Sequence, residues 1–142
     1  MPLAQLNIAQ VRFPLDDARM VGFVEQLADV NAGAEAADGF IWRPKDEYGP
    51  GATSYRLLGR DDLIVNLSVW RDLASLRAYV VGFAAHREAL RERGQWFEQA
   101  TEPMTVCWEV PDGHMPTLEE AEAQLLQLRA EGPSEDVFPF TH

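Results

Sequence analysis

The most constraining feature of the chain is the stretch Leu63–Trp70, in which aliphatic side chains alternate with a second, mixed set. A period of two is typical of a β-strand, whose successive side chains point to opposite faces of a sheet. One face is aliphatic, and the other carries an amide, a hydroxyl and an indole. The two sets are Val65, Leu67 and Val69, and Asn66, Ser68 and Trp70. The second face predicts the wall of a polar-aromatic pocket.

A helix is predicted directly after this strand, beginning at the cap residue Asp72 and ending at Gly94. Its apolar stripe carries an imidazole among larger apolar groups: Tyr79, Phe83, His86 and Leu90. An inward imidazole beside a strand face of amide, hydroxyl and indole groups is the best candidate for a functional site in this chain.

The remaining elements predict an α+β fold. Further strands are expected over 3–13, 40–43 and 103–110, and further helices over 16–34 and 117–131. Residues 53–58 continue or pair with the second strand. The order strand, helix, strand, strand, helix, strand predicts a ferredoxin-like sheet with an added C-terminal helix. Residues 1–132 are expected to form this domain, and 133–142 a partly ordered tail that docks through Val137, Phe138 and Phe140.

A ferredoxin-like sheet with its helices on one face leaves the other face bare. Val65, Leu67 and Val69 need cover, and the opposite side of the same strand is not a plain solvent-facing surface. A second copy of the chain would supply a second layer. The sequence therefore predicts a homodimer.

Composition excludes several classes of protein. The chain of 142 residues has a formal net charge of -11, which repels phosphate backbones, so nucleic acid is not an expected partner. Cys107 is the single cysteine, so an internal disulfide or a cysteine-rich zinc site is excluded. We find no signal peptide and no apolar run near the ~20 residues needed to cross a bilayer. A cytoplasmic protein without a membrane partner is expected.

Several stretches together resemble a bacterial domain of unknown function. The chain is similar to an uncharacterised family of the dimeric α/β-barrel superfamily, which contains the antibiotic-biosynthesis monooxygenases. The resemblance covers residues 3 to about 130 and includes Leu6–Ala9, Gly39–Arg43, Ile64–Trp70, His86, Gln95–Phe97, Trp108, Val110–Pro111 and Gly113–His114. It implies a homodimer in which two sheets form a barrel, with a small-molecule cavity between each sheet and its helices. The superfamily includes cofactor-free oxygenases, haem-degrading enzymes, dehydratases and isomerases.

His86, Asn66 and Asn7 are the candidate catalytic residues. Imidazole exchanges protons near neutral pH, and amide groups steady an oxyanion. The alternative for His86 is a core or interface histidine bonded to the backbone. Asn7, Trp70 and His86 also resemble the set that haem-degrading members use, although the spacing from Trp70 to His86 is longer here. No cofactor is expected, with haem bound through His86 as the alternative.

The candidate substrate-binding residues each have a structural alternative. Ser68 either orients a substrate carbonyl or phenol or bonds to an opposing subunit. Arg43 either binds an anionic group or, as we favour, pairs with a carboxylate such as Asp46 or Glu47. The large rings suit a cavity for flat aromatic ligands or a dimer core equally well. The complete set of expected substrate-binding residues is Trp42, Arg43, Ser68, Trp70, Tyr79, Phe83 and Trp108; no metal site is expected.

These observations predict a small-molecule-binding protein, with a cofactor-independent oxygenase acting on a small aromatic or apolar metabolite as the leading activity. In that reaction His86 takes a proton from an acidic substrate, and Asn66 or Asn7 steadies the oxyanion. A non-catalytic protein that sequesters such a metabolite, and a haem-binding protein, are the alternatives.

Overall fold

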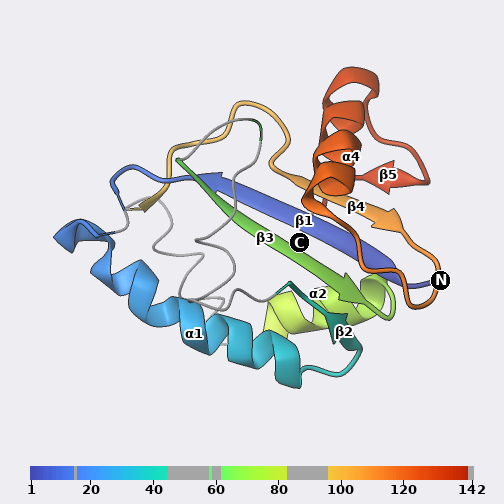
Figure 1. The fold of residues 1–142 in the computed structure, drawn as a ribbon, viewed down its shortest axis with the longest axis horizontal. Helices are drawn as coiled ribbons and strands as arrows, with labels where there is room; N and C mark the ends of the chain where they lie inside the picture. Colours follow the sequence, from blue (N-terminus) through green and yellow to red (C-terminus); the bar gives the residue numbers. More distant parts are fainter. Residues whose placement is uncertain (15, 45–57, 59–61, 83–95, 141–142) are drawn as a thin grey trace.

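The computed structural model describes residues 1–14, 16–44, 58, 62–82 and 96–140 (Figure 1). Its strands are β1 (Leu3–Gln10), β2 (Phe40–Trp42), β3 (Leu63–Trp70), β4 (Thr105–Glu109) and β5 (Val137–Phe138). Its α-helices are α1 (Val21–Ala36), α2 (Leu73–Gly82) and α4 (Leu118–Glu131), and a short 3-10 helix, η1 (Ala18–Met20), precedes α1. Residues 53–57 and Gly94, expected to extend the second strand and to end the second helix, lie outside the described residues.

The strands form one antiparallel sheet in the order β2-β3-β1-β4-β5. Its centre is the pairing of β1 with β3, which runs from Leu3 opposite Trp70 to Gln10 opposite Leu63. The first four strands have the order and connections of a ferredoxin-like fold. The α+β, ferredoxin-like prediction is confirmed, and β3 has the predicted bounds.

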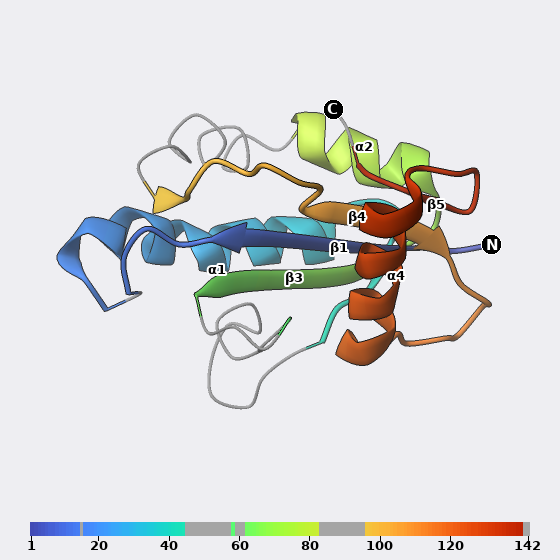
Figure 2. The same cartoon turned by 90° about the horizontal axis from the view of Figure 1, so that it is seen from above.

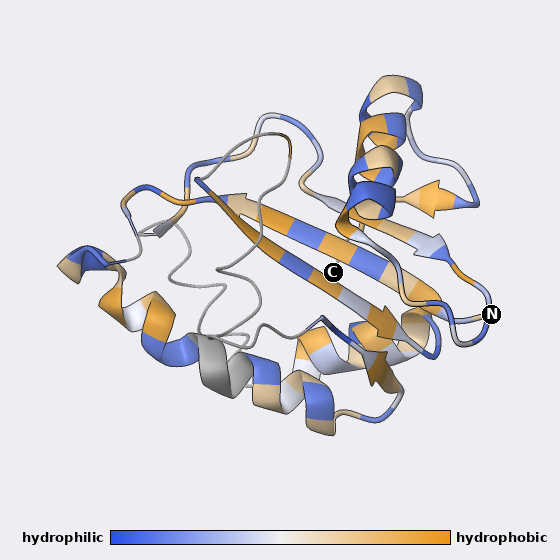
Figure 3. Ribbon diagram, in the orientation of Figure 1, coloured by the Kyte–Doolittle hydropathy of each residue, from blue (hydrophilic) through white to orange (hydrophobic). Residues whose placement is uncertain are grey.

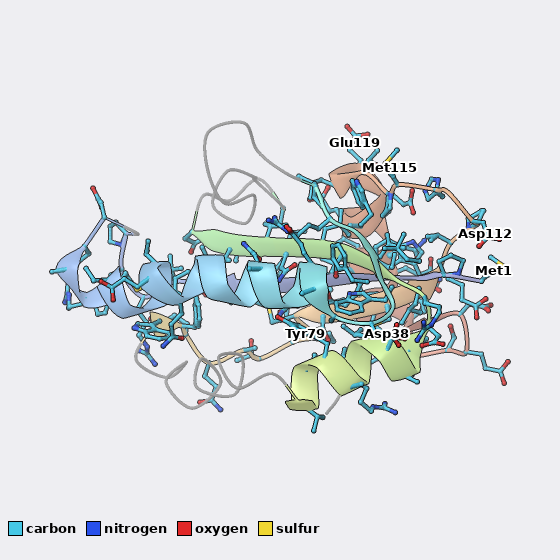
Figure 4. All side chains as sticks on the ribbon, turned by 90° about the horizontal axis from the view of Figure 1, so that it is seen from below. Met1, Asp38, Tyr79, Asp112, Met115 and Glu119 are labelled. Atoms are coloured by element: carbon cyan, nitrogen blue, oxygen red, sulfur yellow. The ribbon has the colours of Figure 1, made fainter. Side chains whose placement is uncertain are left out.

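Helices cover both faces of this sheet. Seen from above, α4 lies in front of the strands (Figure 2), and seen from below, α1 and α2 lie in front of them (Figure 4). We call the two sides the α4 face and the α1/α2 face. Along β1 and β3 hydrophobic and hydrophilic residues alternate (Figure 3), so each strand contributes a different set of side chains to each face.

The α4 face is the larger apolar core. Its side chains come from β1, β3, the β4 segment, β5 and the inward stripe of α4, and none is more than 6% exposed. They are Ala4, Leu6, Ile8, Leu63, Val65, Leu67, Val69, Val106, Trp108, Val110, Ala121, Leu125, Leu128 and Val137. The expectation that Val65, Leu67 and Val69 need a second copy of the chain to cover them is therefore wrong, because the chain buries them itself.

The α1/α2 face has two smaller apolar clusters, one at each end. Met20, Phe23, Ile64 and Trp96 form the first. The second joins the sheet to α2 and contains Leu3, Trp70, Leu76, Val80 and Cys107. Between these clusters the strands present polar side chains, which are described with the candidate site.

The helices begin where the sequence places their caps. The Asp72 carboxylate accepts a hydrogen bond of 2.8 Å from the backbone N–H of Ser75, and Thr117 Oγ1 accepts one of 3.1 Å from the N–H of Glu120. Such bonds satisfy N–H groups that the first helical turn leaves unpaired. The two carboxylate oxygens of Glu120 bond to the Trp108 indole and to His114 rather than to the start of the helix.

The C-terminal segment contributes a strand that the sequence analysis does not predict. β5 pairs with β4, with Val137 opposite Trp108 and Phe138 opposite Cys107. Thr105 Oγ1 also accepts a 2.9 Å hydrogen bond from the backbone N–H of Phe140. The tail therefore extends the sheet of its own chain.

Gly39 should be the least replaceable of the described glycines. Its φ is 88°, and a Cβ there would collide with the Ser75 side chain. Left-handed strain and overpacking together should make Gly39→Ala cost about 2–4 kcal/mol of unfolding free energy, measured by urea denaturation. Gly82→Ala is the control, since no described atom lies within 4 Å of its added Cβ. Equal stability of the two variants would contradict the prediction.

Candidate functional site

The polar part of the α1/α2 face is built by two neighbouring strands. In the β1–β3 register Gln5 lies opposite Ser68, and Asn7 lies opposite Asn66. Directly opposed residues of antiparallel strands have Cβ atoms about 4.5–5.5 Å apart, so each pair is in contact range. The prediction that Asn66, Ser68 and Trp70 share one side of β3 agrees with this register, and Asn7 joins them from β1.

Ser68 is held by bonds within its own chain. Its Oγ accepts a 2.9 Å hydrogen bond from the indole Nε1–H of Trp70 and donates one of 3.1 Å to Gln5 Oε1. All three residues are buried. Ser68 therefore links Gln5 to Trp70 through two hydrogen bonds. Its observed partners belong to its own chain.

Trp70 forms the closed aromatic end of the site. Its ring stacks on Tyr79 of α2 at a centroid distance of 5.3 Å and meets the edge of Phe40 at 5.4 Å. It is only 1% exposed. Tyr79 lies between α2 and the strands (Figure 4), and burial raises the pKa of its phenol. Trp70 is thus a structural wall, without a free ring face for a ligand.

Asn7 and Asn66 are the polar residues of this face whose side chains are available to a ligand. Both are half-buried. Within the part of the chain that the structure describes, neither carboxamide makes a hydrogen bond, whereas Gln5 and Ser68 beside them do. A carboxamide offers two N–H donors and an acceptor oxygen. The pair can therefore hold a polar group of a bound molecule from two adjacent strands.

Trp42 and Trp108, expected to line the same pocket, lie on the opposite side of the sheet. Trp42 is opposite Val69, and Trp108 is opposite Ala4. Both pack with the apolar core of the α4 face. The Trp108 indole donates a 3.0 Å hydrogen bond to Glu120, whose other oxygen lies 2.7 Å from His114 Nε2. The two rings therefore do not face Asn7 and Asn66, and their expected role in ligand binding stays a prediction.

Arg43 pairs with a carboxylate, as the sequence analysis favours. Its Nε lies 2.7 Å from Glu35 Oε1 on α1. The partner is not one of the two acidic residues proposed from the sequence, Asp46 and Glu47, which lie outside the described residues. A guanidinium already paired in this way is a weak candidate for binding an anionic substrate.

His86 and Phe83 lie outside the described residues, so their expected roles stay predictions. Among the described residues the structure brings together Asn7, Asn66, Ser68, Trp70 and Tyr79. It adds Gln5, which the sequence analysis does not name. The alternation of β1 contains the signal that identifies it, because Gln5 and Asn7 are polar residues two positions apart on a face of β1 whose other residues, Leu3 and Ala9, are apolar.

The described residues contain neither a metal-binding cluster nor a membrane-spanning helix. No group of three or more histidine, cysteine, aspartate or glutamate side chains is placed to hold a metal ion there. Among the helices of that same part of the chain, none has the length and apolar character needed to cross a membrane.

Solved structures define the class of fold. Rv0793 from Mycobacterium tuberculosis matches with a TM-score of 0.54 at 12% identity, over 81% of this chain and 100% of that one. SnoaB, a cofactor-independent oxygenase from Streptomyces nogalater, matches with a TM-score of 0.51 at 19% identity, over 78% and 94%. A conserved protein from Methanosarcina mazei Go1 matches with 0.54 at 14% identity, over 78% and 94%. These likenesses show that the chain shares the ferredoxin-like fold of these proteins.

The family follows from the sequence as a whole. The profile of the domain of unknown function DUF3291 matches residues 2–142, and the chain belongs to this family. No curated protein matches the chain. The resemblance to an uncharacterised family, a domain of unknown function, is confirmed.

Ser68→Ala should destabilise the protein without any ligand being present. It leaves the Trp70 indole N–H and Gln5 Oε1 buried and unpaired, and such losses cost about 1–3 kcal/mol. Urea denaturation should show this decrease, while Thr101→Ala on the exposed surface should stay within about 0.5 kcal/mol of the parent. An unchanged midpoint for Ser68→Ala would contradict the structural role of this hydroxyl.

Cys107 should react slowly with thiol reagents in the folded protein. It is fully buried, and burial raises the pKa of its thiol to about 12. Since the thiolate is the reactive form, little of it exists at pH 8. The folded state holds this proton more tightly than the unfolded state, so the contribution of Cys107 to stability should fall as pH rises from 9 toward 12. Labelling followed by mass spectrometry at pH 8 should be slow, and fast in urea; fast native labelling would refute this.

Proposed function

We propose that this protein binds a small molecule against the α1/α2 face of its sheet, with Asn7 and Asn66 holding the polar group of that molecule. The observation that carries the proposal is the pair of half-buried carboxamides on adjacent strands without a hydrogen bond among the described residues. Leaving a partly desolvated amide unpaired costs free energy, so a ligand that satisfies both groups gains affinity. Their neighbours Gln5 and Ser68 bond to each other and keep this surface rigid.

The leading activity is that of a cofactor-independent oxygenase. SnoaB, whose fold this chain shares, is such an enzyme. In the reaction that we propose, a bound phenol or enol loses a proton, and the N–H groups of Asn7 and Asn66 donate hydrogen bonds to the resulting oxyanion. Donors aimed at a developing charge are a large source of catalysis. The electron-rich carbanion form of this anion then combines with O2 and a proton to give a hydroperoxide, and loss of water from the hydroperoxide leaves a carbonyl at the reacting carbon. We propose His86 as the acceptor of the first proton.

A non-catalytic binding role is the second candidate, and the titration behaviour of this face favours it. Tyr79 and Cys107 are titratable groups at the Trp70 end of the site, and burial raises the pKa of both. Both keep their protons at neutral pH and cannot act as bases there. Unless His86 acts as the base, the site orients a ligand but does not remove a proton from it.

Haem binding fits the described residues poorly. The haem hypothesis needs the Trp70 indole to crowd the haem plane, but this ring is enclosed by Phe40 and Tyr79 and bonded to Ser68. A Soret band that disappears in His86→Ala would be needed to support it.

The homodimer also stays a proposal, supported by the fold class. The α4 face cannot supply the interface while α4 covers it, because Val65, Leu67 and Val69 are at most 4% exposed in one chain. A dimer would have to use other surfaces, such as the β2 edge, where Ile41 is 50% exposed.

Oxygen uptake with a panel of quinols and phenols tests the proposal. Asn66→Leu should lower turnover by about 10²–10³, as removal of one oxyanion donor does in other enzymes. Gln127→Leu, on the exposed side of α4, is the matched control and should keep full activity. His86→Ala against His114→Ala tests the proton acceptor in the same assay.

The same panel can reject the proposal. Turnover that survives Asn66→Leu unchanged would remove the oxyanion role of this face. Ligand binding by tryptophan fluorescence that depends on Asn66, without any oxygen uptake, would leave the binding role and exclude the oxygenase.

A further inference from the structure

The carboxamides of Asn7 and Asn66 belong to a polar row that continues onto β4. Thr105 lies opposite Asn7 in the register of β1 with β4, and Asn66 lies opposite Asn7 in the register of β1 with β3. Directly opposed residues point to the same face of a sheet, so the three side chains lie side by side on the α1/α2 face. The neighbouring pair, Leu6 and Val106, belongs to the apolar core of the other face. Thr105 is therefore the third polar residue of this row.

The Thr105 hydroxyl is occupied by the C-terminal tail. Its Oγ1 accepts a 2.9 Å hydrogen bond from the backbone N–H of Phe140 and donates one of 3.3 Å to the carbonyl oxygen of the same residue. The pairing of β5 with β4 ends at Phe138, and Pro139 has no N–H group with which to continue it. The hydroxyl of Thr105 therefore takes the place of a backbone pairing and fixes the tail beside the polar row.

The tail places an aromatic residue at the β4 end of the polar row. Phe140 is partly buried and packs with the cluster that contains Trp70 and Cys107 from the sheet and Leu76 and Val80 from α2. Figure 2 shows the C-terminal segment on the β4 side of the sheet, near α2. Helix α4, from which this tail comes, covers the opposite face. The C-terminal region thus contributes to both faces, and Phe140 bounds the polar row on this side.

We propose that Phe140, positioned by Thr105, is the wall that limits the length of the ligand held by Asn7 and Asn66. Neighbouring strands lie about 4.8 Å apart, so the lines of β1 and β5 are separated by about 10 Å. A phenol with a short apolar substituent fits between Asn7 and this wall, and a longer one meets Phe140. The inference rests on the proposed function and specifies its ligand class. Phe140 is the specificity-determining residue, and Thr105 is a positioning residue that acts through it.

A series of 4-alkylphenols measures the distance to this wall. In isothermal titration calorimetry on the full chain, affinity should rise about fourfold for each added methylene, because each one buries apolar surface. It should fall once the alkyl chain reaches Phe140, and we call this chain length the length limit. Phe140→Ala should move the length limit to longer chains, with a gain of about tenfold in affinity for 4-heptylphenol relative to 4-ethylphenol. Asn66→Leu should weaken binding of all members equally.

Substitutions of Thr105 separate positioning from a structural role. Thr105→Val cannot bond to the tail and should move the length limit in the same direction as Phe140→Ala, whereas Thr105→Ser keeps the hydroxyl and should keep the limit of the parent. Ser134→Ala is the matched control, because Ser134 Oγ accepts a 3.1 Å hydrogen bond from the N–H of Val137 and holds the same tail before β5. It should leave the length limit unchanged. A purely structural role of Thr105 would lower the urea midpoint of Thr105→Val without moving the limit.

An unchanged length limit in both Phe140→Ala and Thr105→Val would overturn the wall, and so would the absence of alkylphenol binding. The proposed function would survive an unchanged limit if Asn66→Leu still weakened binding. A limit that Ser134→Ala moves as far as Thr105→Val does would overturn the positioning role of Thr105. Binding that Asn66→Leu leaves intact, with a limit that moves in Phe140→Ala, would place the ligand against the tail and reject the carboxamides as its polar partners.

Discussion

The pairing of β1 with β3 is the constraint on which the candidate site depends. Its antiparallel register sets Asn7 opposite Asn66 and Gln5 opposite Ser68, and alternation then sends the neighbouring aliphatic side chains to the other face. A slip of one residue would exchange the faces and place carboxamides in the apolar core under α4. Only one register of β1 and β3 therefore places the polar residues on one face and the aliphatic residues on the other. The same alternation of residues forms both the candidate site and the apolar core.

Burial on both faces separates this chain from the simplest version of its fold. A ferredoxin-like sheet with helices on one side needs outside cover for the other side. Here Ala121, Leu125 and Leu128 of α4 supply that cover within the chain, and β5 extends the sheet beside it. The sheet therefore has no exposed apolar face that requires a second subunit, and its polar side chains lie on the face toward α1 and α2.

The sequence predicted the parts of the structure that local patterns determine. β3 has a clear alternation and strong turn signals, and the caps at Asp72 and Thr117 are local bonds. It could not assign Trp42 and Trp108 to a face, because both sides of the sheet are apolar at their positions and a large ring fits either one. β5 is a two-residue pairing that depends on β4 rather than on its own pattern.

The chemistry available to the described site is orientation and polarisation rather than proton transfer. The chain carries a formal net charge of -11, yet the strand residues facing α1 and α2 across the middle of β1 and β3 are amides and a hydroxyl. In such a neutral setting a hydrogen bond to a developing oxyanion is stronger than in water, and the same setting opposes a ligand that arrives charged. An uncharged substrate that becomes an anion only after binding would meet both conditions. Asn7 and Asn66 cannot remove the proton of such a substrate, so another residue must act as the base. The role of His86 therefore decides between the proposed enzyme and the proposed binding protein.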